Sequence, residues 1–259
     1  MSQEILYEVN DCVGRITFNR PEARNAFTFP MYERLAEICQ EASADSSVKV
    51  LVLTGAGEKA FAAGTDISEF RKFSAAQDAL DYEARINGLL DAFERIPIPT
   101  IAAISGACTG GGATIAACCD LRIGAANARF GVPIARTLGN CLSMSNYVRL
   151  AALLGPARVT ELIFTARLIG SDEARTIGLL SEVLPDYAAL QSRAEELART
   201  VASQAPLTLR VTKEALRRIK EKMTPEEDGD MLLTCYLSRD FREGLDAFLN
   251  KRTPKWTGT

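Results

Sequence analysis

The amino-acid sequence predicts an α/β fold with a helical C-terminal region. Short apolar runs that suit buried strands alternate with helical patterns in the first part of the chain, and from about residue 147 the patterns are helical. The chain has 259 residues, of which 47% are hydrophobic and 24% charged, which is the composition of a globular protein. This length permits one large domain, or one domain with a smaller appendage.

Local patterns predict the individual elements in chain order. Alternating apolar residues on either side of the turn at Asn10, Asp11 and Cys12 predict a β-hairpin. The expected strands are apolar runs bounded by turn residues: 5–9, 13–18, 48–53, 100–104 and 120–124. Pro97 and Pro99 end a long helical region. The expected helices share apolar residues at helical spacing: 31–39, 66–95, 113–119, 186–203, 206–222 and 229–252.

The composition excludes several kinds of chemistry and partner. The chain has no histidine, so it can build neither a Ser-His-Asp triad nor an HExxH zinc site, and we expect no metal. Seven cysteines without a CxxC pair indicate a reducing compartment, and a net charge of −3 gives no general attraction to nucleic acid. The N-terminus does not resemble a signal peptide, and no apolar run approaches the ~20 residues of a membrane helix. We therefore expect a cytoplasmic protein without a membrane or nucleic-acid partner.

Two glycine-containing loops are the candidate functional segments. The segment TGGGAT (109–114) lies between an expected strand and an expected helix, where free backbone N–H groups favour an approaching negative charge. The segment AFAAGTDI (60–67) also leads from small residues into a helix. Two such loops can present two N–H donors to one oxygen atom, as in an oxyanion hole. The alternative is that each loop is only a tight turn packed against its neighbours.

Several motifs together resemble the enoyl-CoA hydratase/isomerase (crotonase) superfamily. They occur in the family's order and spacing along almost the whole chain: NRPEARNA (19–26), FAAGTDI (61–67), IAAISG (101–106), GGG (110–112), CDLRI (119–123), FGVP (130–133) and EGLDAFLNKR (243–252). The resemblance implies a spiral core of ββα turns in residues 1–200, which holds the acyl-CoA site. It also implies a C-terminal helical trimerisation region in residues 201–259.

The resemblance further implies roles for individual residues. The backbone N–H groups of Thr65 and Gly111 would hold the thioester oxygen of an acyl-CoA substrate and stabilise an enolate. Family positions that contact CoA fall on Arg24, Ala26, Ala63, Asp66, Ile67, Phe248 and Lys251, the last two often in a neighbouring subunit. Lys251 could instead only solvate a helix end. Because CoA is part of the substrate, no separate cofactor is expected, and the implied assembly is a homotrimer or a dimer of trimers.

The sequence departs from the family at its catalytic glutamates. Hydratases of the family carry one glutamate two residues beyond the glycine triplet and another directly after the proline of FGxP. Thr114 and Ile134 occupy these two positions here. Neither side chain can serve as a general base near neutral pH. The resemblance therefore predicts a thioester site, and the two replacements argue against routine hydration.

Three alternatives follow from the remaining residues. Related chlorobenzoyl-CoA dehalogenases carry a nucleophilic aspartate that aligns with Cys141 when one gap is introduced. Cys141 could then be a nucleophile whose thiol pKa is lowered by Arg136. The alternative is that Cys141 is only a small buried residue. As a decarboxylase of malonyl-type thioesters, the chain would use Ile134 to desolvate the leaving carboxylate and Arg136 or Asn140 to position it; as a hydrolase, it would instead cleave the thioester. A chain that binds acyl-CoA without catalysis is the third alternative.

Other side chains could contribute to the pocket or to assembly. Carboxylates in or after the second loop could enter the acyl pocket or could lie on a solvated helix face: Asp66, Glu69, Asp81 and Glu83. Apolar residues of the last helix predict a contact between subunits: Leu232, Leu233, Tyr236 and Leu237. The basic residues between 210 and 222 alternate with glutamates at helical spacing, which indicates a solvated amphipathic face.

Overall fold

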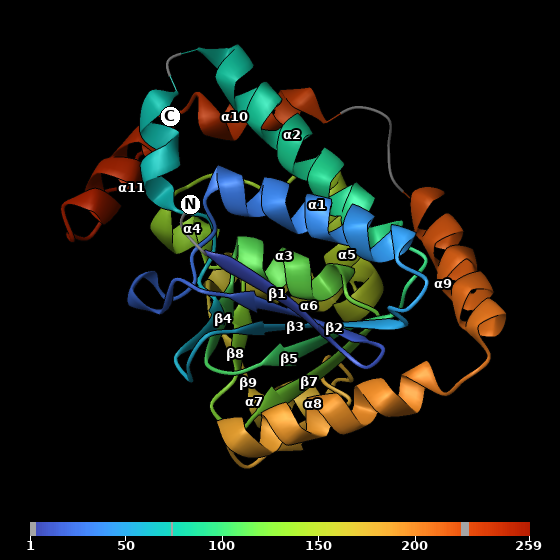
Figure 1. Cartoon of the computed structure of the whole chain (residues 1–259). Coiled ribbons are helices and arrows are strands. Elements are labelled where there is room, and N and C mark those ends of the chain that lie inside the picture. The colour runs from blue at the N-terminus through green and yellow to red at the C-terminus, as the bar shows by residue number, and fades with distance from the viewer. Residues whose placement is uncertain (1–3, 74, 224–227) are drawn as a thin grey trace.

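The computed structural model describes residues 4–73, 75–223 and 228–259, and Figure 1 shows the whole chain. Its larger sheet has six strands in the order β1-β2-β3-β5-β7-β10. These strands are Ile5–Asn10, Val13–Phe18, Val50–Gly55, Thr100–Ile104, Leu121–Ala125 and Glu182–Leu184. β1 and β2 form the expected antiparallel hairpin, and the remaining neighbours pair in parallel.

A second, four-stranded sheet stands beside the first in the order β4-β6-β8-β9. Its strands have only two or three residues each: Ala60–Ala62, Ala107–Thr109, Arg129–Gly131 and Ile169–Gly170. The chain visits one strand of the larger sheet, one strand of the smaller sheet and then a helix, as in β3-β4-α2 and β5-β6-α3. This repetition is the spiral of ββα turns that the sequence resemblance predicted.

Helices cover both faces of the larger sheet (Figure 1). α1 (Phe29–Ala44), α2 (Ala76–Glu94) and α3 (Gly111–Cys118) lie over one face and share its core. α8 (Tyr187–Ala202) covers the other face, where alanines let it approach the sheet closely. The other helices are α4 (Ile134–Thr137), α5 (Met144–Leu154), α6 (Pro156–Thr165), α7 (Ser171–Thr176), α9 (Pro206–Glu221), α10 (Gly229–Tyr236) and α11 (Arg239–Leu249). Strands 50–55 and 100–104 are covered on both sides, so all their residues are buried and most are apolar, with Thr54 and Thr100 as the polar exceptions.

Two predicted helices are each divided in the structure. The region 66–95 contains a 3₁₀ helix, Ile67–Lys72, and then α2. The region 229–252 breaks into α10 and α11 at Ser238, whose hydroxyl accepts a hydrogen bond from the Phe241 N–H and so caps the second helix. The break turns the two helices back over the body of the molecule, where they pack on Phe70 and Leu138.

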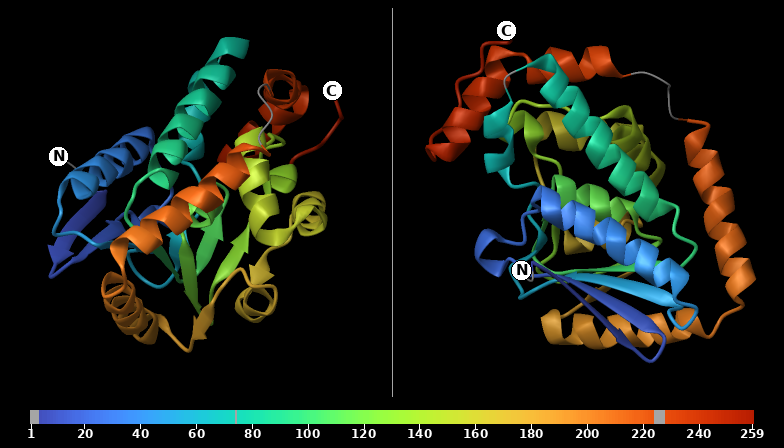
Figure 2. Two further views of the ribbon diagram at one scale, coloured as in Figure 1. Left: turned by 90° about the vertical axis from the view of Figure 1, so that its right-hand side faces the viewer. Right: turned by 45° about the horizontal axis from the view of Figure 1, so that its top comes forward.

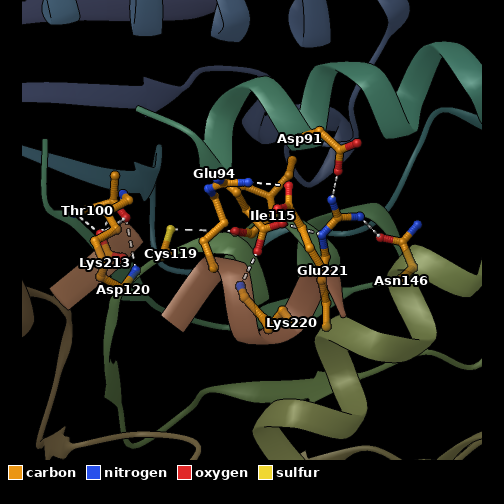
Figure 3. A network of polar contacts seen from close by, with 12 residues as sticks. Asp91, Glu94, Thr100, Ile115, Cys119, Asp120, Asn146, Lys213, Lys220 and Glu221 are labelled. Carbon is orange, nitrogen blue, oxygen red and sulfur yellow. Dashed lines mark hydrogen bonds and ion pairs between the residues drawn. The ribbon is translucent and has the colours of Figure 1, made fainter. Parts of the chain in front are cut away.

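α9 runs along the outside of the molecule and is fastened to it by charged side chains (Figure 2). Lys213 contacts the carboxylate of Asp120 at 2.8 Å, and Lys220 contacts Glu94 at 2.5 Å (Figure 3). Asp120 also accepts hydrogen bonds from the backbone N–H and the hydroxyl of Thr100, so these contacts link α9 to the start of β5. None of the residues of α9 is buried in the single chain. Within the described residues, no helix is both long and apolar enough to cross a bilayer.

Candidate functional site

A cavity of about 630 Å³ lies where the 19–26 loop, the segment 63–67 after β4, β6, α2, α4 and α10 meet. Most residues that the sequence singled out line it: Arg24, Ala26, Ala63, Thr65, Asp66, Ile67, Gly111, Thr114, Ile134, Asn140, Cys141 and Phe248. Arg136 and Lys251 do not belong to its lining, and both are exposed. The cavity therefore joins segments that are more than 200 residues apart in the sequence.

The backbone N–H of Thr65 is aimed away from the neighbouring strand. Phe27 and Thr65 form an isolated parallel bridge, in which the Phe27 N–H donates to Gly64 O and the Asp66 N–H donates to Phe27 O. These two bonds use the groups on either side of Thr65 and leave its own N–H on the opposite side. Gly64 makes this turn with a φ of 106°, which side chains rarely adopt.

The second candidate donor is the N–H of Gly111, the first residue of α3. An N–H at this position has no partner within its own helix. A Cβ on Gly111 would lie only 3.5 Å from Thr65 N, so the two loops approach each other closely. Neither N–H has a hydrogen-bond partner among the described residues. Both are therefore free to donate a hydrogen bond to a ligand.

Two tyrosines hold the side chain of Thr65. The hydroxyl of Tyr32 lies 2.9 Å from Thr65 Oγ1, and the hydroxyl of Tyr82 donates to the same oxygen at 3.5 Å. Tyr32 is buried, which raises the pKa of its phenol to about 12, so this hydroxyl keeps its proton near neutral pH. No sequence pattern assigns a role to the Thr65 side chain, but these contacts hold the loop that carries the N–H.

At one end of the cavity, an ion pair fixes the loop expected to contact CoA. The guanidinium of Arg20 donates to Ala26 O at 2.6 Å and to Asp66 Oδ2 at 3.1 Å. Burial tends to raise the pKa of Asp66, but hydrogen bonds from Ser68 and Arg20 outweigh it and hold this pKa below its usual value. Arg24 remains exposed on the cavity lining and offers a positive charge to an anionic ligand.

The positions of the two missing glutamates both face the cavity. Thr114 is buried on α3, and its hydroxyl donates to Gly111 O at 2.8 Å. Ile134 is buried at the start of α4. A threonine hydroxyl committed to the backbone and a hydrocarbon side chain supply neither a base nor a site for activating water.

The structure does not support a nucleophilic thiolate at position 141. Burial, the adjacent Cys235 thiol and the charges of Glu83 and Asp228 all raise the pKa of Cys141, whereas a nucleophile needs a lowered pKa. Arg136, the side chain expected to lower it, is exposed outside the cavity lining. We therefore favour the alternative interpretation, in which Cys141 is a structural residue of the cavity wall.

One of the carboxylates considered from the sequence is a buried member of the cavity. Glu83 on α2 is 6% exposed and accepts a hydrogen bond from the Tyr236 hydroxyl at 2.5 Å. Asp81 is exposed on the same helix, and the side chain of Glu69 lies outside the described residues. The sequence did carry a signal for Glu83, because it occupies the buried stripe of α2 together with Ala79, Ile86, Leu90 and Phe93.

The C-terminal helices complete the cavity within the same chain. Tyr236 on α10 and Phe248 on α11 both belong to its lining. The expectation that Leu232 and Tyr236 contact another subunit is wrong for these two residues, because both are buried against the chain's own Phe70 and Leu138. Leu237, in contrast, is 45% exposed.

Comparisons with known proteins identify the family. The model of the enoyl-CoA hydratase/isomerase family matches residues 8–259. The chain is 35% identical over 258 residues to the short-chain-enoyl-CoA hydratase of Clostridium acetobutylicum, covering 96% of this chain and 95% of that protein. It is 32% identical to the 2,3-dehydroadipyl-CoA hydratase of Escherichia coli, covering 98% of this chain and 99% of that protein.

Solved structures extend the similarity to three dimensions. A methylmalonyl-CoA decarboxylase in complex with 2-nitronate-propionyl-CoA has a TM-score of 0.91 at 28% identity, with complete coverage of both chains. An enoyl-CoA hydratase/carnithine racemase from Magnetospirillum magneticum has a TM-score of 0.81 at 35% identity, covering 100% of this chain and 97% of that one. The fold and site define a crotonase-fold protein of the acyl-CoA class. The chain belongs to the enoyl-CoA hydratase/isomerase family.

Proposed function

We propose that the protein binds an acyl-CoA thioester in this cavity and transforms it through an enolate whose oxygen is held by the N–H groups of Thr65 and Gly111. The observation that carries the proposal is the meeting of two unpartnered donors from separate loops, within the described structure, at one cavity. Donors fixed in advance stabilise charge that develops on the thioester oxygen without reorganising during the reaction.

The proposed chemistry takes place at the α-carbon and is not routine hydration. Addition of water needs a group that holds and deprotonates it, and Thr114 and Ile134 stand where the family's hydratases carry glutamates. The relatives' names include hydratases, so the chain would share their thioester site but not their water chemistry.

Decarboxylation of a malonyl-type thioester is a second candidate. It is favoured by the similarity to the methylmalonyl-CoA decarboxylase and by the buried Ile134 on the cavity wall. An apolar wall disfavours a charged carboxylate, and its departure as CO2 leaves the same enolate without a strong base. Neither side chain considered for holding the carboxylate is placed to do so: the Asn140 amide N–H groups donate to Cys141 O and to the Tyr236 hydroxyl, and Arg136 lies outside the cavity lining.

A panel of purified thioesters tests the proposal. We expect binding of crotonyl-CoA without hydration above background, together with either double-bond migration in a 3-enoyl-CoA or CO2 release from malonyl- or methylmalonyl-CoA. Benzoyl-CoA is included as a further thioester, and the release of free CoA is measured to detect hydrolysis. Rapid hydration of crotonyl-CoA would contradict the assignment of chemistry, and binding of every thioester without conversion would indicate a non-catalytic acyl-CoA-binding subunit.

We also propose that residues 201–259 assemble the chain into a homotrimer or a dimer of trimers. Apolar side chains of α9 and its end are more than half exposed in the single chain: Leu207, Val211, Leu216, Ile219 and Met223. Light scattering should give three or six times the mass of the chain, and Val211→Glu should lower it, whereas Arg210→Glu on the same helix should not. A monomer mass for the unaltered protein would contradict the assembly.

The free cysteines are consistent with a reducing compartment such as the cytoplasm.

A further inference from the structure

Glu83 is a carboxylate to which the proposed function assigns no role. It is the only acidic side chain among the described residues that is buried, and it forms no ion pair with a lysine or arginine there. A carboxylate placed on the apolar stripe of α2 costs stability unless it is neutralised or hydrogen-bonded. Because Glu83 also lines the cavity, a role toward a ligand would explain why a carboxylate occupies this buried position.

A short polar chain leads from Glu83 along the cavity wall. Tyr236 donates its hydroxyl hydrogen to Glu83 Oε1 at 2.5 Å, and Asn140 Nδ2 donates to the Tyr236 hydroxyl oxygen at 3.3 Å. The other amide atom, Asn140 Oδ1, is buried and has no hydrogen-bond partner in the described structure. An acceptor buried without a partner is costly, so this atom is suited to a hydrogen-bond donor that a substrate brings.

Glu83 and the oxyanion hole face the same space. Tyr82, the residue before Glu83 on α2, donates a hydrogen bond to Thr65 Oγ1. Tyr32 contacts the same oxygen and also interacts electrostatically with Glu83. Thr65, Gly111 and Glu83 all line the cavity. A thioester whose carbonyl oxygen meets the two N–H groups would therefore lie in a cavity that Glu83 also borders.

The surroundings of Glu83 suit a group that exchanges protons near neutral pH. The pKa of Glu83 is raised from 4.5 to about 7. Burial is the main cause and the charge of Asp228 adds to it, whereas the hydrogen bond from Tyr236 lowers the pKa. The other titratable groups that interact with it are Tyr32 on α1 and Cys141 before α5. At pH 7 both the carboxylate and the carboxylic acid are populated, as an acid–base catalyst requires.

We infer that Glu83 is the catalytic acid–base group that removes a proton from the α-carbon of the bound thioester and returns it, with Tyr236 and Asn140 positioning its carboxylate. The inference rests on the proposed enolate chemistry. The carboxylate takes the α-hydrogen as a proton, the C–H electron pair forms the Cα=C bond, and the carbonyl π pair moves to the oxygen held by Thr65 and Gly111. The reverse step, or protonation of an enolate left by CO2, consumes the proton on Glu83. Glu83 thus does from α2 what no side chain at positions 114 and 134 can do.

Deuterium exchange into butyryl-CoA in D2O tests this step without knowledge of the natural acyl group. The unaltered protein should catalyse exchange at the α-carbon, and Glu83→Gln should lower the rate at least about 100-fold while retaining butyryl-CoA binding by calorimetry. Asp81→Asn, which removes the neighbouring exposed carboxylate of the same helix, should leave the rate unchanged.

The pH profile separates catalysis from a structural role. The exchange rate of the unaltered protein should rise with pH to a plateau through a midpoint near 7, because the carboxylate is the base. Tyr236→Phe removes the hydrogen bond that lowers the pKa of Glu83, so its midpoint should move to higher pH. Unchanged exchange in Glu83→Gln would overturn the assignment of Glu83 alone. Binding without exchange by the unaltered protein would overturn the enolate chemistry and this inference with it.

Discussion

Replacing Gly111 with proline is expected to lower kcat/KM about 100- to 1,000-fold relative to alanine at the same position, which is the usual effect of losing one oxyanion-hole donor. Proline has no N–H, and it is tolerated at the first position of a helix, which Gly111 occupies in α3. A Cβ at this position would lie 2.3 Å from the hydroxyl oxygen of Tyr32. Both variants should therefore be made in a Tyr32→Phe background, where that oxygen is absent.

The alanine variant is the matched control for this prediction. It adds the same Cβ, including its 3.0 Å approach to Thr65 Oγ1, but it keeps the N–H. Rates should be compared by deuterium exchange into butyryl-CoA or with whichever thioester the panel shows to react. Equal activities of the proline and alanine variants, with equal thermal stability, would show that the Gly111 N–H does not hold the developing negative charge.

The pH dependence of stability should carry a contribution of about 3 kcal/mol from Glu83. Its pKa rises from 4.5 to about 7 on folding, and 1.36 kcal/mol per unit gives this figure. Because the folded state binds the proton more tightly than the unfolded state, the contribution is complete below pH 4.5 and is lost as the pH rises through 7. The unaltered protein should therefore lose stability relative to Glu83→Gln over this range.

Urea unfolding at pH 4.5 and pH 8 measures this contribution. The difference in unfolding free energy between the unaltered protein and Glu83→Gln should change by about 3 kcal/mol between these two pH values. Titrating groups that do not interact with Glu83 affect both proteins equally, so they cancel in the difference. Asp81→Asn should show no such change. Parallel pH profiles for the unaltered protein and Glu83→Gln would mean that the carboxylate is solvated and not proton-binding near pH 7.

Five of the six strands of the larger sheet could be predicted from the sequence because they are five or six residues long and mostly apolar, whereas β10, with three residues, was missed. The hairpin and the strand Thr100–Ile104 lie where they were expected. The smaller sheet was missed, because strands such as Ala60–Ala62 have too few residues for any periodicity. The break between α10 and α11 was missed because Ser238 interrupts an otherwise continuous helical pattern, and a capping serine is recognised only once the next turn is seen to start there.

The backbone part of the site was easier to predict than its side-chain part. The glycine loops mark a chain reversal before a helix, and this local signal leads to Thr65 and Gly111 without knowledge of the packing. Glu83 and Tyr236 are 153 residues apart, and only the folding of α10 back over α2 brings them together. Local sequence patterns cannot report such a contact, although a glutamate on the apolar stripe of α2 does indicate burial.

A crystal structure with acetyl-CoA bound would show whether the two loops hold the thioester oxygen. We expect the thioester carbonyl oxygen to lie ~2.7–3.1 Å from both Thr65 N and Gly111 N, the distance of an oxyanion-hole bond. We also expect the acetyl methyl group, which is the α-carbon, to point toward the carboxyl of Glu83. A carbonyl oxygen that faces solvent, or one bound by the side chain of Thr114 or Asn140 instead of the two N–H groups, would contradict this expectation.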